Sequence, residues 1–242
     1  LRDFSNLRLI QVAQGTAVLT LVLTLRALWK QESVRPMSRE ERAAPRPKFS
    51  DAWADFTSGG DAGRLLVVVF LGTMAFNMQD VLLEPYGGEV LGLSVSATTL
   101  LTAIWALGAL TGFGLAARWL KQGFSPYRMC VRGILIGLAA FSAVIFADPM
   151  HSPPLFYAGA CGIGLGGGLF AVSTLTAAMT LPMGKNAGQG LALGAWGAAQ
   201  ATAAGLAIAL GGTIRDGVGA LAASGALGET LNTPGTGYSV VY

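Results

Sequence analysis

The fold is decided by residues 65–88, LLVVVFLGTMAFNMQDVLLEPYGG, in which an unbroken apolar run ends in a polar segment. The apolar part, 65–76, is typical of a membrane-embedded helix. Charged groups at that depth are costly unless they are paired or functional. Two amides, an aspartate and a glutamate nevertheless follow within residues 77–84. We therefore take 77–88 as the candidate functional segment and expect the rest of the chain to be its scaffold.

The composition indicates an integral membrane protein. The 242 residues are 52% hydrophobic and 12% charged, whereas a soluble domain carries about 25% charged residues. The 34 glycines lie largely inside apolar runs, as they do in packed membrane helices. The net charge of +3 comes from Lys and Arg in loops beside these runs. Such residues indicate topology and not a nucleic-acid partner.

Six apolar blocks are long enough to be complete transmembrane helices. The predicted spans are about 9–29, 64–83, 91–117, 129–147, 155–181 and 187–212. Residues 213–236 are predicted to be irregular, and 237–242 resemble the start of another span. The predicted fold is therefore an all-α polytopic membrane helix bundle, and we expect it to be part of a longer polypeptide.

A charged, proline-containing loop separates the first span from the next five. We expect 1–29 to be the last helix of an N-terminal half, 30–63 a central loop, and 64–242 an incomplete C-terminal half. Within the loop, 49–56 fits either a short amphipathic helix on the membrane surface or a loop with scattered aromatic residues. Two halves around a central loop are the architecture of major facilitator proteins, which we predict here by analogy.

The distribution of basic residues predicts the orientation of the spans. Most of the 16 Lys and Arg residues fall on the side of the 30–63 loop when the spans alternate. The positive-inside rule therefore predicts that this loop is cytoplasmic. The candidate segment 77–88 would then lie at the non-cytoplasmic end of its span.

Residue spacing predicts how the polar groups of the segment are arranged. Asp80 and Glu84 are four residues apart and would share one helical face, with Asn77 one turn before Asp80. Pro85 is expected to end this helix, and the glycine pair after it would allow a sharp turn. These oxygen donors suit a hard cation such as magnesium. The alternative is a solvated helix end with salt bridges to a neighbouring repeat.

Glycines in the spans predict close helix packing. Gly108 and Gly112 form a GxxxG pair, which lets two backbones approach. The glycines of 159–168 are expected to pack in the same way, and the alternative is a flat surface for a porphyrin ring or an antenna helix. Cys130 and Cys161 are expected to be small buried residues.

The segment 76–92, FNMQDVLLEPYGGEVLG, resembles the QD-x-L-x-EPYGG segment of the PucC/LhaA family, the bacteriochlorophyll-delivery branch of the major facilitator superfamily. The central basic loop, and LSVSATT at 93–99, follow the order of that family. The resemblance implies an assembly factor for light-harvesting complexes in the inner, intracytoplasmic photosynthetic membrane of bacteria. Such a protein delivers bacteriochlorophyll, chaperones antenna polypeptides, or does both.

The resemblance also implies partners and site residues. The implied partners are antenna polypeptides, bacteriochlorophyll and its synthase, and membrane lipid, with no nucleic acid. Bacteriochlorophyll would be a transient cofactor or cargo. The pigment- or partner-binding residues that we expect are Asn77, Gln79, Asp80, Glu84, Pro85, Tyr86, Gly87 and Gly88.

Two other functions stay open, a small-molecule or proton-coupled transporter and a structural subunit of a photosynthetic supercomplex. A transporter requires an acidic residue that faces a midplane cavity. The expected position of Asp80 and Glu84 near one end of their span favours the assembly factor. No catalytic set and no metal-ligand spacing occurs in the sequence, so we expect no enzymatic activity. His151, the one histidine, is expected to be a surface residue more readily than a pigment ligand.

Overall fold

The computed structural model describes residues 6–29, 47–58, 60–182 and 188–242, and these residues form helices and no strand. The chain divides into two compact units, 1–46 and 47–242. In the first unit, the apolar helix α1 (Asn6–Leu28) carries Arg26 in its last turn. Residues 30–46 of the predicted central loop lie outside the described part.

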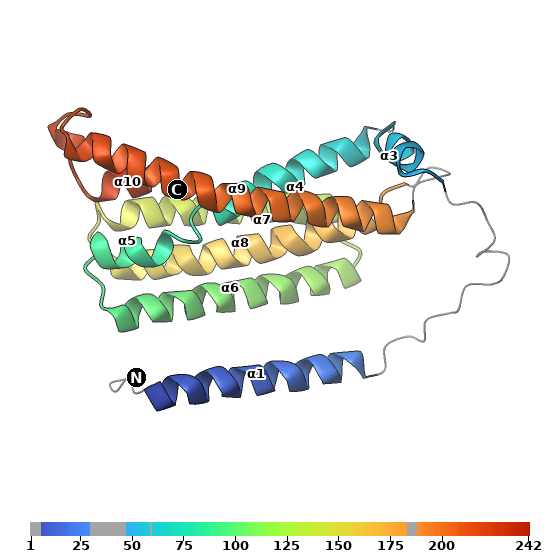
Figure 1. Cartoon of the computed structure of the whole chain (residues 1–242), viewed down its shortest axis with the longest axis horizontal. Coiled ribbons are helices and arrows are strands. Elements are labelled where there is room, and N and C mark those ends of the chain that lie inside the picture. The colour runs from blue at the N-terminus through green and yellow to red at the C-terminus, as the bar shows by residue number, and fades with distance from the viewer. Residues whose placement is uncertain (1–5, 30–46, 59, 183–187) are drawn as a thin grey trace. The chain divides into compact units, whose positions relative to one another are not determined.

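The second unit contains three long apolar helices, a longer one, and several short pieces (Figure 1). Its elements are α3 (Phe49–Ser58), α4 (Asp61–Asn77), α5 (Leu83–Glu89), α6 (Val95–Lys121), α7 (Pro126–Ala147), α8 (Pro153–Met179), α9 (Gln189–Ala223), the 3-10 turn η1 (Glu229–Leu231) and α10 (Gly235–Ser239).

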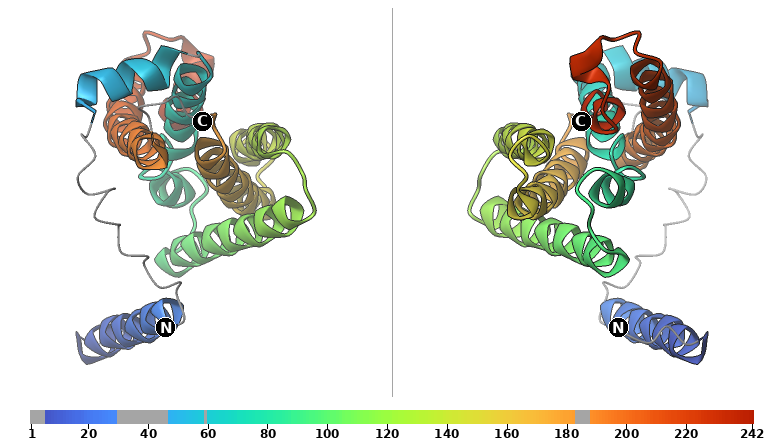
Figure 2. Two further views of the ribbon diagram at one scale, coloured as in Figure 1. Left: turned by 90° about the vertical axis from the view of Figure 1, so that its right-hand side faces the viewer. Right: turned by 90° about the vertical axis from the view of Figure 1, so that its left-hand side faces the viewer.

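Helix α8 is the centre of this unit, with α6 and α7 packed along it (Figure 2). Glycines make the close approach possible. A Cβ atom at Gly112 of α6 would lie 2.5 Å from the Leu165 carbonyl oxygen, and one at Gly166 of α8 would lie 2.7 Å from the Gly133 carbonyl oxygen. Both distances are too short for any side chain, so backbone packs on backbone. The predicted packing roles of the GxxxG pair and of the 159–168 glycines are confirmed.

Four helices of the described residues are long and apolar enough to cross a membrane, namely α6, α7, α8 and α9. A fifth span results if the bent pair of α3 and α4 is counted as one. Helix α1 adds a shorter apolar stretch, Ile10–Arg26. The predicted all-α polytopic bundle is confirmed, with fewer full-length spans than the six expected. The analogy with major facilitator proteins stays a prediction.

Two helix boundaries in the second unit differ from the predicted ones. The second span was expected to continue to Leu83, but α4 ends at Asn77 and a separate helix, α5, follows. Residues 213–236 were expected to be irregular, but α9 continues to Ala223, where Ala and Leu at 220–223 favour a helix. Only after Ala223 does the chain turn, through η1, into α10.

Segment 49–56 is helical, so the first of its two interpretations is confirmed as far as the helix is concerned. The helix α3 brings Phe49 and Trp53 within 6.0 Å of each other, measured between ring centroids. Phe56 is buried against Ala62 and Leu65 at the start of α4. Whether α3 lies on a membrane surface stays a prediction.

Candidate functional site

The candidate segment forms a break within a span. Helix α4 ends at Asn77, residues 78–82 form a turn, and α5 starts at Leu83. The turn is closed by backbone hydrogen bonds from the Leu82 and Leu83 N–H groups to the Gln79 carbonyl oxygen, at 2.8 and 3.0 Å. Figure 1 shows α4 ending part of the way along α8, with α5 near the end where α6 and α8 begin. The polar groups therefore start inside the bundle.

A cavity of about 180 Å³ lies beside this break, and we call it the break cavity. Its polar lining comes from Thr73 and Asn77 of α4, Asp80 of the turn, and Gln200 of α9. Its apolar lining comes from Phe76 of α4 and from the central parts of α6 and α8. These residues are Phe76, Trp105, Ala109, Phe113, Ile163, Gly164, Gly167, Gly168, Phe170 and Ala171.

Hydrogen bonds fix some of these polar groups and leave others free. The Asn77 side-chain Nδ2 donates to the Thr73 carbonyl oxygen at 2.7 Å. The Gln79 Nε2 donates to the Asp80 Oδ1 at 3.4 Å. The Thr73 Oγ1 and the Gln79 Oε1 are buried and have no hydrogen-bond partner in the described structure. Buried polar groups without a partner are uncommon and point to a bound group or a function.

The predicted arrangement of the two carboxylates is wrong. Asp80 and Glu84 do not share a helical face, because the helix breaks between Asn77 and Leu83. Asp80 faces the break cavity, whereas Glu84 accepts a hydrogen bond from the Thr102 hydroxyl of α6. Asp80, three residues after the end of α4, therefore lies beside residues from the middle of α6 and α8, and its depth in the membrane stays a prediction.

The predicted roles of the proline and the glycine pair also need correction. Pro85 does not end a helix but lies in the first turn of α5, where a missing N–H group costs little. Gly87 and Gly88 lie within α5 and form no sharp turn. A Cβ atom at Gly87 would lie 3.1 Å from the Phe156 ring and 3.3 Å from Leu93, whereas one at Gly88 would meet nothing within 4 Å.

Tyr86 is the packing centre of the segment, and its side chain is fully buried. Its ring lies 5.4 Å from the rings of Phe156 and Tyr238 and 5.5 Å from that of Tyr242. Its hydroxyl donates to the Val144 carbonyl oxygen at a long 3.4 Å. These contacts connect α5 to α7, α8 and α10, so Tyr86 holds the segment in place and is not free to bind a ligand.

An ion pair that we did not predict joins the ends of α5, α9 and α10. The Arg215 Nη2 donates to the Glu89 Oε2 at 2.6 Å, and the Tyr238 hydroxyl donates to the same oxygen at 2.6 Å. The Arg215 guanidinium also lies over the Tyr238 ring, 4.6 Å from its centroid. Burial, followed by the hydrogen bond to Glu89, raises the pKa of Tyr238 to about 12. The phenol therefore stays protonated and keeps donating to Glu89 at physiological pH.

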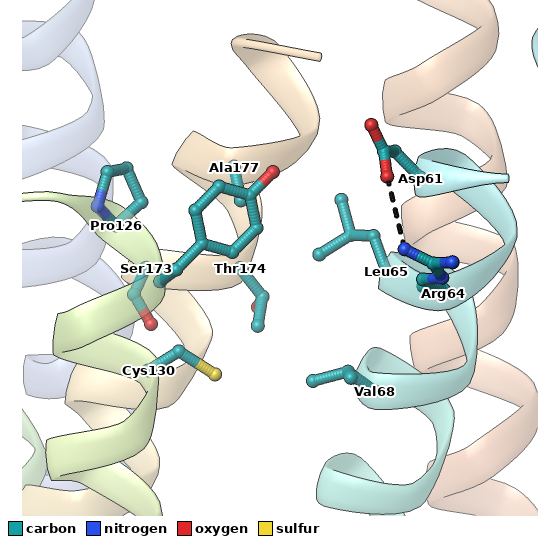
Figure 3. A pocket seen from close by; sticks show the side chains of 10 residues that line it. Asp61, Arg64, Leu65, Val68, Pro126, Cys130, Ser173, Thr174 and Ala177 are labelled. Atoms are coloured by element: carbon teal, nitrogen blue, oxygen red, sulfur yellow. Dashed lines mark ion pairs between the residues drawn. The ribbon is translucent and has the colours of Figure 1, made fainter. Parts of the chain in front are cut away.

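Two further cavities lie between α4 and α7, and we call them together the α4–α7 groove. The first, of about 410 Å³, lies between Asp61, Arg64, Leu65 and Val68 of α4 and residues of α7 and α8 (Figure 3). Asp61 and Arg64 form an ion pair at its rim, at 3.7 Å. The facing residues are Pro126, Tyr127, Cys130, Ser173, Thr174 and Ala177.

The second cavity of the groove is larger and almost wholly apolar. Its volume is about 550 Å³, and Val68 lines both cavities. Leu71, Ile134 and Leu138 line it with exposed side chains. The hydroxyl of Tyr242, which also lines it, is buried and has no hydrogen-bond partner in the described structure.

These volumes decide where a pigment could fit. Small-molecule sites are about 300–1,000 Å³. At about 180 Å³ the break cavity is below this range, and the predicted pigment-binding role of Asn77 and Asp80 stays a prediction. The 550 Å³ cavity is within range and is apolar, with one free hydroxyl. The described residues contain no group of three or more His, Cys, Asp and Glu side chains suited to a metal ion.

Helix α9 presents a row of small residues that no other described part of the chain covers. Cβ atoms added at Gly190, Gly194, Gly197 and Gly205 would meet nothing within 4 Å. With the exposed Ala201, their spacing of three or four residues places them on one helical face. We call this row the α9 glycine face.

Sequence reasoning missed Thr73, Gln200 and Glu89. Thr73 could have been found, because it lies one helical turn before Asn77 in the same span. Gln200 is an amide in the interior of an apolar span, which is itself a signal. His151 is exposed in the loop between α7 and α8, with a positive φ of 46°. This position agrees with the expected surface residue. Cys130 is buried and Cys161 half-buried, and both are free.

Comparison with known proteins gives consistent matches. The family model described as PUCC protein matches residues 1–242. The chain is 55% identical over its whole length to an uncharacterised protein of the puhA-bchM intergenic region of Rhodobacter capsulatus, covering 50% of that protein. It is 50% identical to Protein PucC of Rhodovulum sulfidophilum, over 90% of this chain and 48% of that protein.

A more distant relative carries a pigment-related name. The chain is 32% identical to the Bacteriochlorophyll synthase 44.5 kDa chain of Rhodobacter capsulatus, over 85% of this chain and 48% of that protein. The chain thus spans about half the length of the curated relatives that it matches. No solved structure matches it.

Proposed function

We propose that this chain, which belongs to the PUCC protein family, is part of a non-enzymatic assembly factor for bacterial light-harvesting complexes. It binds nascent antenna polypeptides in the membrane and brings them together with bacteriochlorophyll. The chain acts by binding and positioning its cargo.

The α9 glycine face is the observation that carries this proposal. Antenna polypeptides with single transmembrane helices need a surface that a helix can approach closely. Helix association in membranes depends on such small-residue faces, because lipid provides no hydrophobic driving force. In α9 the small residues recur from Gly190 to Gly205 and are open, so a partner helix can pack there without displacing any part of the bundle.

The pigment part of the proposal rests on the α4–α7 groove and on the relatives. The apolar cavity of about 550 Å³ opens between exposed apolar side chains of α4 and α7. It suits the hydrocarbon part of a pigment that arrives from the lipid phase. The Tyr242 hydroxyl offers one polar contact. One relative bears the name of a bacteriochlorophyll synthase chain, and we propose that synthase as a further partner.

The proposed location is the bacterial inner membrane, including its intracytoplasmic photosynthetic part, with the 30–63 loop on the cytoplasmic side. The apolar helices α6 to α9 support a multi-pass membrane protein. The orientation follows from the positive-inside rule. Cysteine labelling from either side, at Ser50 in α3 and at Ser152 between α7 and α8, tests it. The opposite labelling pattern would reverse the proposed orientation.

The assembly role is tested by filling the α9 glycine face. We expect Gly194→Leu and Gly205→Leu, made in the full-length protein in pigmented cells, to lower antenna absorption strongly while the protein stays in the membrane. Gly217→Leu is the matched control. It lies in the same helix, is equally open, and points away from the glycine face. Normal antenna levels in both glycine-face variants would contradict the proposal.

A transporter is the second candidate, and the position of Asp80 favours it. A carboxylate that faces a cavity at mid-bundle is the feature that a proton-coupled transporter requires. Antenna levels in an Asp80→Asn variant separate the two functions. The assembly role through α9 predicts little change, whereas a transport role for Asp80 predicts a loss as large as that of a deletion strain.

A further inference from the structure

The break cavity joins a negative charge, free acceptor oxygens and aromatic walls. The structure assigns it as a binding site for a small organic ammonium ion, and we propose this independently of the assembly role. The site is built by the break between α4 and α5 and closed by α6, α8 and α9. The argument rests on the charge balance, the acceptors, the walls and the size of the cavity.

The Asp80 carboxylate gives the cavity a negative charge that a bound cation would neutralise. Asp80 forms no ion pair with any described residue, and its one side-chain hydrogen bond comes from the neutral Gln79 amide. The cavity lies among central residues of α6 and α8, and Asp80 is exposed beside it, where an unpaired carboxylate in contact with lipid is costly. Lys, Arg and His are all absent from its lining. A bound cation would supply the missing partner.

Oxygen acceptors surround the carboxylate. The Asn77 Nδ2 is used by the Thr73 carbonyl oxygen, which leaves the Asn77 Oδ1 as an acceptor. Thr73 is one of the lining residues, and its Oγ1 is buried with no partner among the described residues. Gln200 adds an amide from α9. An ammonium group donates up to three hydrogen bonds, and these groups accept them.

The walls favour an organic cation over a metal ion. Trp105, Phe113 and Phe76 line the cavity, and aromatic faces attract ammonium groups and hold their carbon substituents. A metal ion such as Ca²⁺ instead takes six to eight oxygen ligands, often several carboxylates. Asp80 is the only carboxylate in this lining.

The size of the cavity limits the ligand. At about 180 Å³ the cavity has the volume of roughly six water molecules, each with a share of about 30 Å³. This is enough for methylammonium, ethylammonium or tetramethylammonium, and too little for a pigment ring. Gly164, Gly167 and Gly168 of α8 lie along one side, and a Cβ atom at Gly167 would lie 3.5 Å from the Phe76 ring.

The experiment is calorimetric titration of the purified, detergent-solubilised protein with methylammonium, tetramethylammonium and sodium chloride at constant ionic strength. We expect both ammonium ions to bind and sodium not to. Asp80→Asn should weaken methylammonium binding at least about tenfold, because the ligand loses a charged hydrogen-bond partner. Tetramethylammonium has no N–H group and should lose only the attraction between the two charges. The matched control is Asp51→Asn. Asp51 is an exposed carboxylate of α3 that does not line the cavity, so this variant should bind ammonium as the wild type does.

A second variant keeps the test decisive if Asp80→Asn does not fold. Trp105→Leu preserves an apolar wall and removes the aromatic face, so tetramethylammonium should bind about threefold to tenfold more weakly. Sodium binding as tight as that of methylammonium would overturn the assignment. So would wild-type ammonium affinity in both variants, or the absence of any ammonium binding to the wild type. None of these outcomes bears on the antenna measurements for α9, so the two proposals fail separately.

Discussion

Helices α8 and α9 are both rich in glycine and free of charge over most of their length, yet they use glycine in opposite ways. In α8, Cβ atoms at Gly159, Gly164, Gly166 and Gly168 would collide with the backbones of α6 or α7. In α9, most glycines face open space. Half of the most apolar part of α8 is buried, against 17% in α9. Glycine in α8 closes the bundle, and glycine in α9 leaves a surface for something else.

The role of the glycines in a span therefore depends on which helices pack against that span. Because α6 and α7 pack closely on two sides of α8, the glycines at these contacts leave no room for a side chain. One glycine of α9 is packed against backbone. A Cβ atom at Gly211 would lie 2.4 Å from the Met78 carbonyl oxygen at the helix break. The remaining glycines of α9 are not needed for the packing of the described residues.

The largest effect is expected for Gly164→Leu in α8. A Cβ atom there would collide with the Trp105 carbonyl oxygen and lie 2.9 Å from the Ala109 nitrogen, and backbone cannot move aside as a side chain can. We expect the variant to fail to accumulate in the membrane. Gly197→Leu in α9 is the matched variant and should accumulate normally, as judged by immunoblotting of membranes. Equal amounts of the two variants in the membrane would contradict the proposed difference between α8 and α9.

A middle-sized effect is expected for Gly72→Ala in α4. The added Cβ atom would meet only the outer end of the Phe170 ring, which can shift at the expense of the packing around it. Overpacking of this kind costs about 1–3 kcal/mol, and we expect the lower part of that range. Thermal unfolding in detergent measures it, with the double variant Gly72→Ala, Phe170→Leu as a check. If removing the ring does not restore stability, the contact is not its cause.

The smallest effect is expected for Gly205→Ala in α9. The added methyl group meets nothing in the chain, and alanine favours a helix over glycine by up to about 1 kcal/mol. The variant should therefore unfold at the same temperature as the wild type or slightly higher. A clear loss of stability would show that the α9 glycine face is packed within the protein, which would also remove the surface required for antenna docking.

Much of the scaffold could be predicted from the sequence. The apolar blocks at 91–117, 129–147 and 155–181 correspond to α6, α7 and α8, because a long uncharged run has no alternative to a helix in a membrane. The GxxxG pair at Gly108 and Gly112 indicated packing correctly. Local composition and residue spacing are enough to predict a helix and its close packing, because neither depends on which residue of the neighbouring helix is in contact.

The candidate site was predicted less well, because it depends on where a helix breaks. The spacing of Asp80 and Glu84 predicts a shared face only if the helix continues, and Pro85 was taken as its end. In the structure the helix ends eight residues earlier, at Asn77, and Pro85 belongs to the next one. The break follows from tertiary contacts: Tyr86 packs between α7, α8 and α10 and pulls α5 out of line with α4. Contacts with residues so distant in sequence leave no local pattern.

The break at 78–82 also has a consequence for the biogenesis of the protein. Helix α4 is short and is followed by Asp80, and an aspartate at the centre of a span opposes insertion by about 2.5–3.5 kcal/mol. The α4–α5 region therefore inserts stably only with help from helices that are made later. Helix α9, which lies against the break through Gly211, follows it in the chain only after α6, α7 and α8. The polar break is thus sealed from lipid on this side only after α9 has been made and has packed on it.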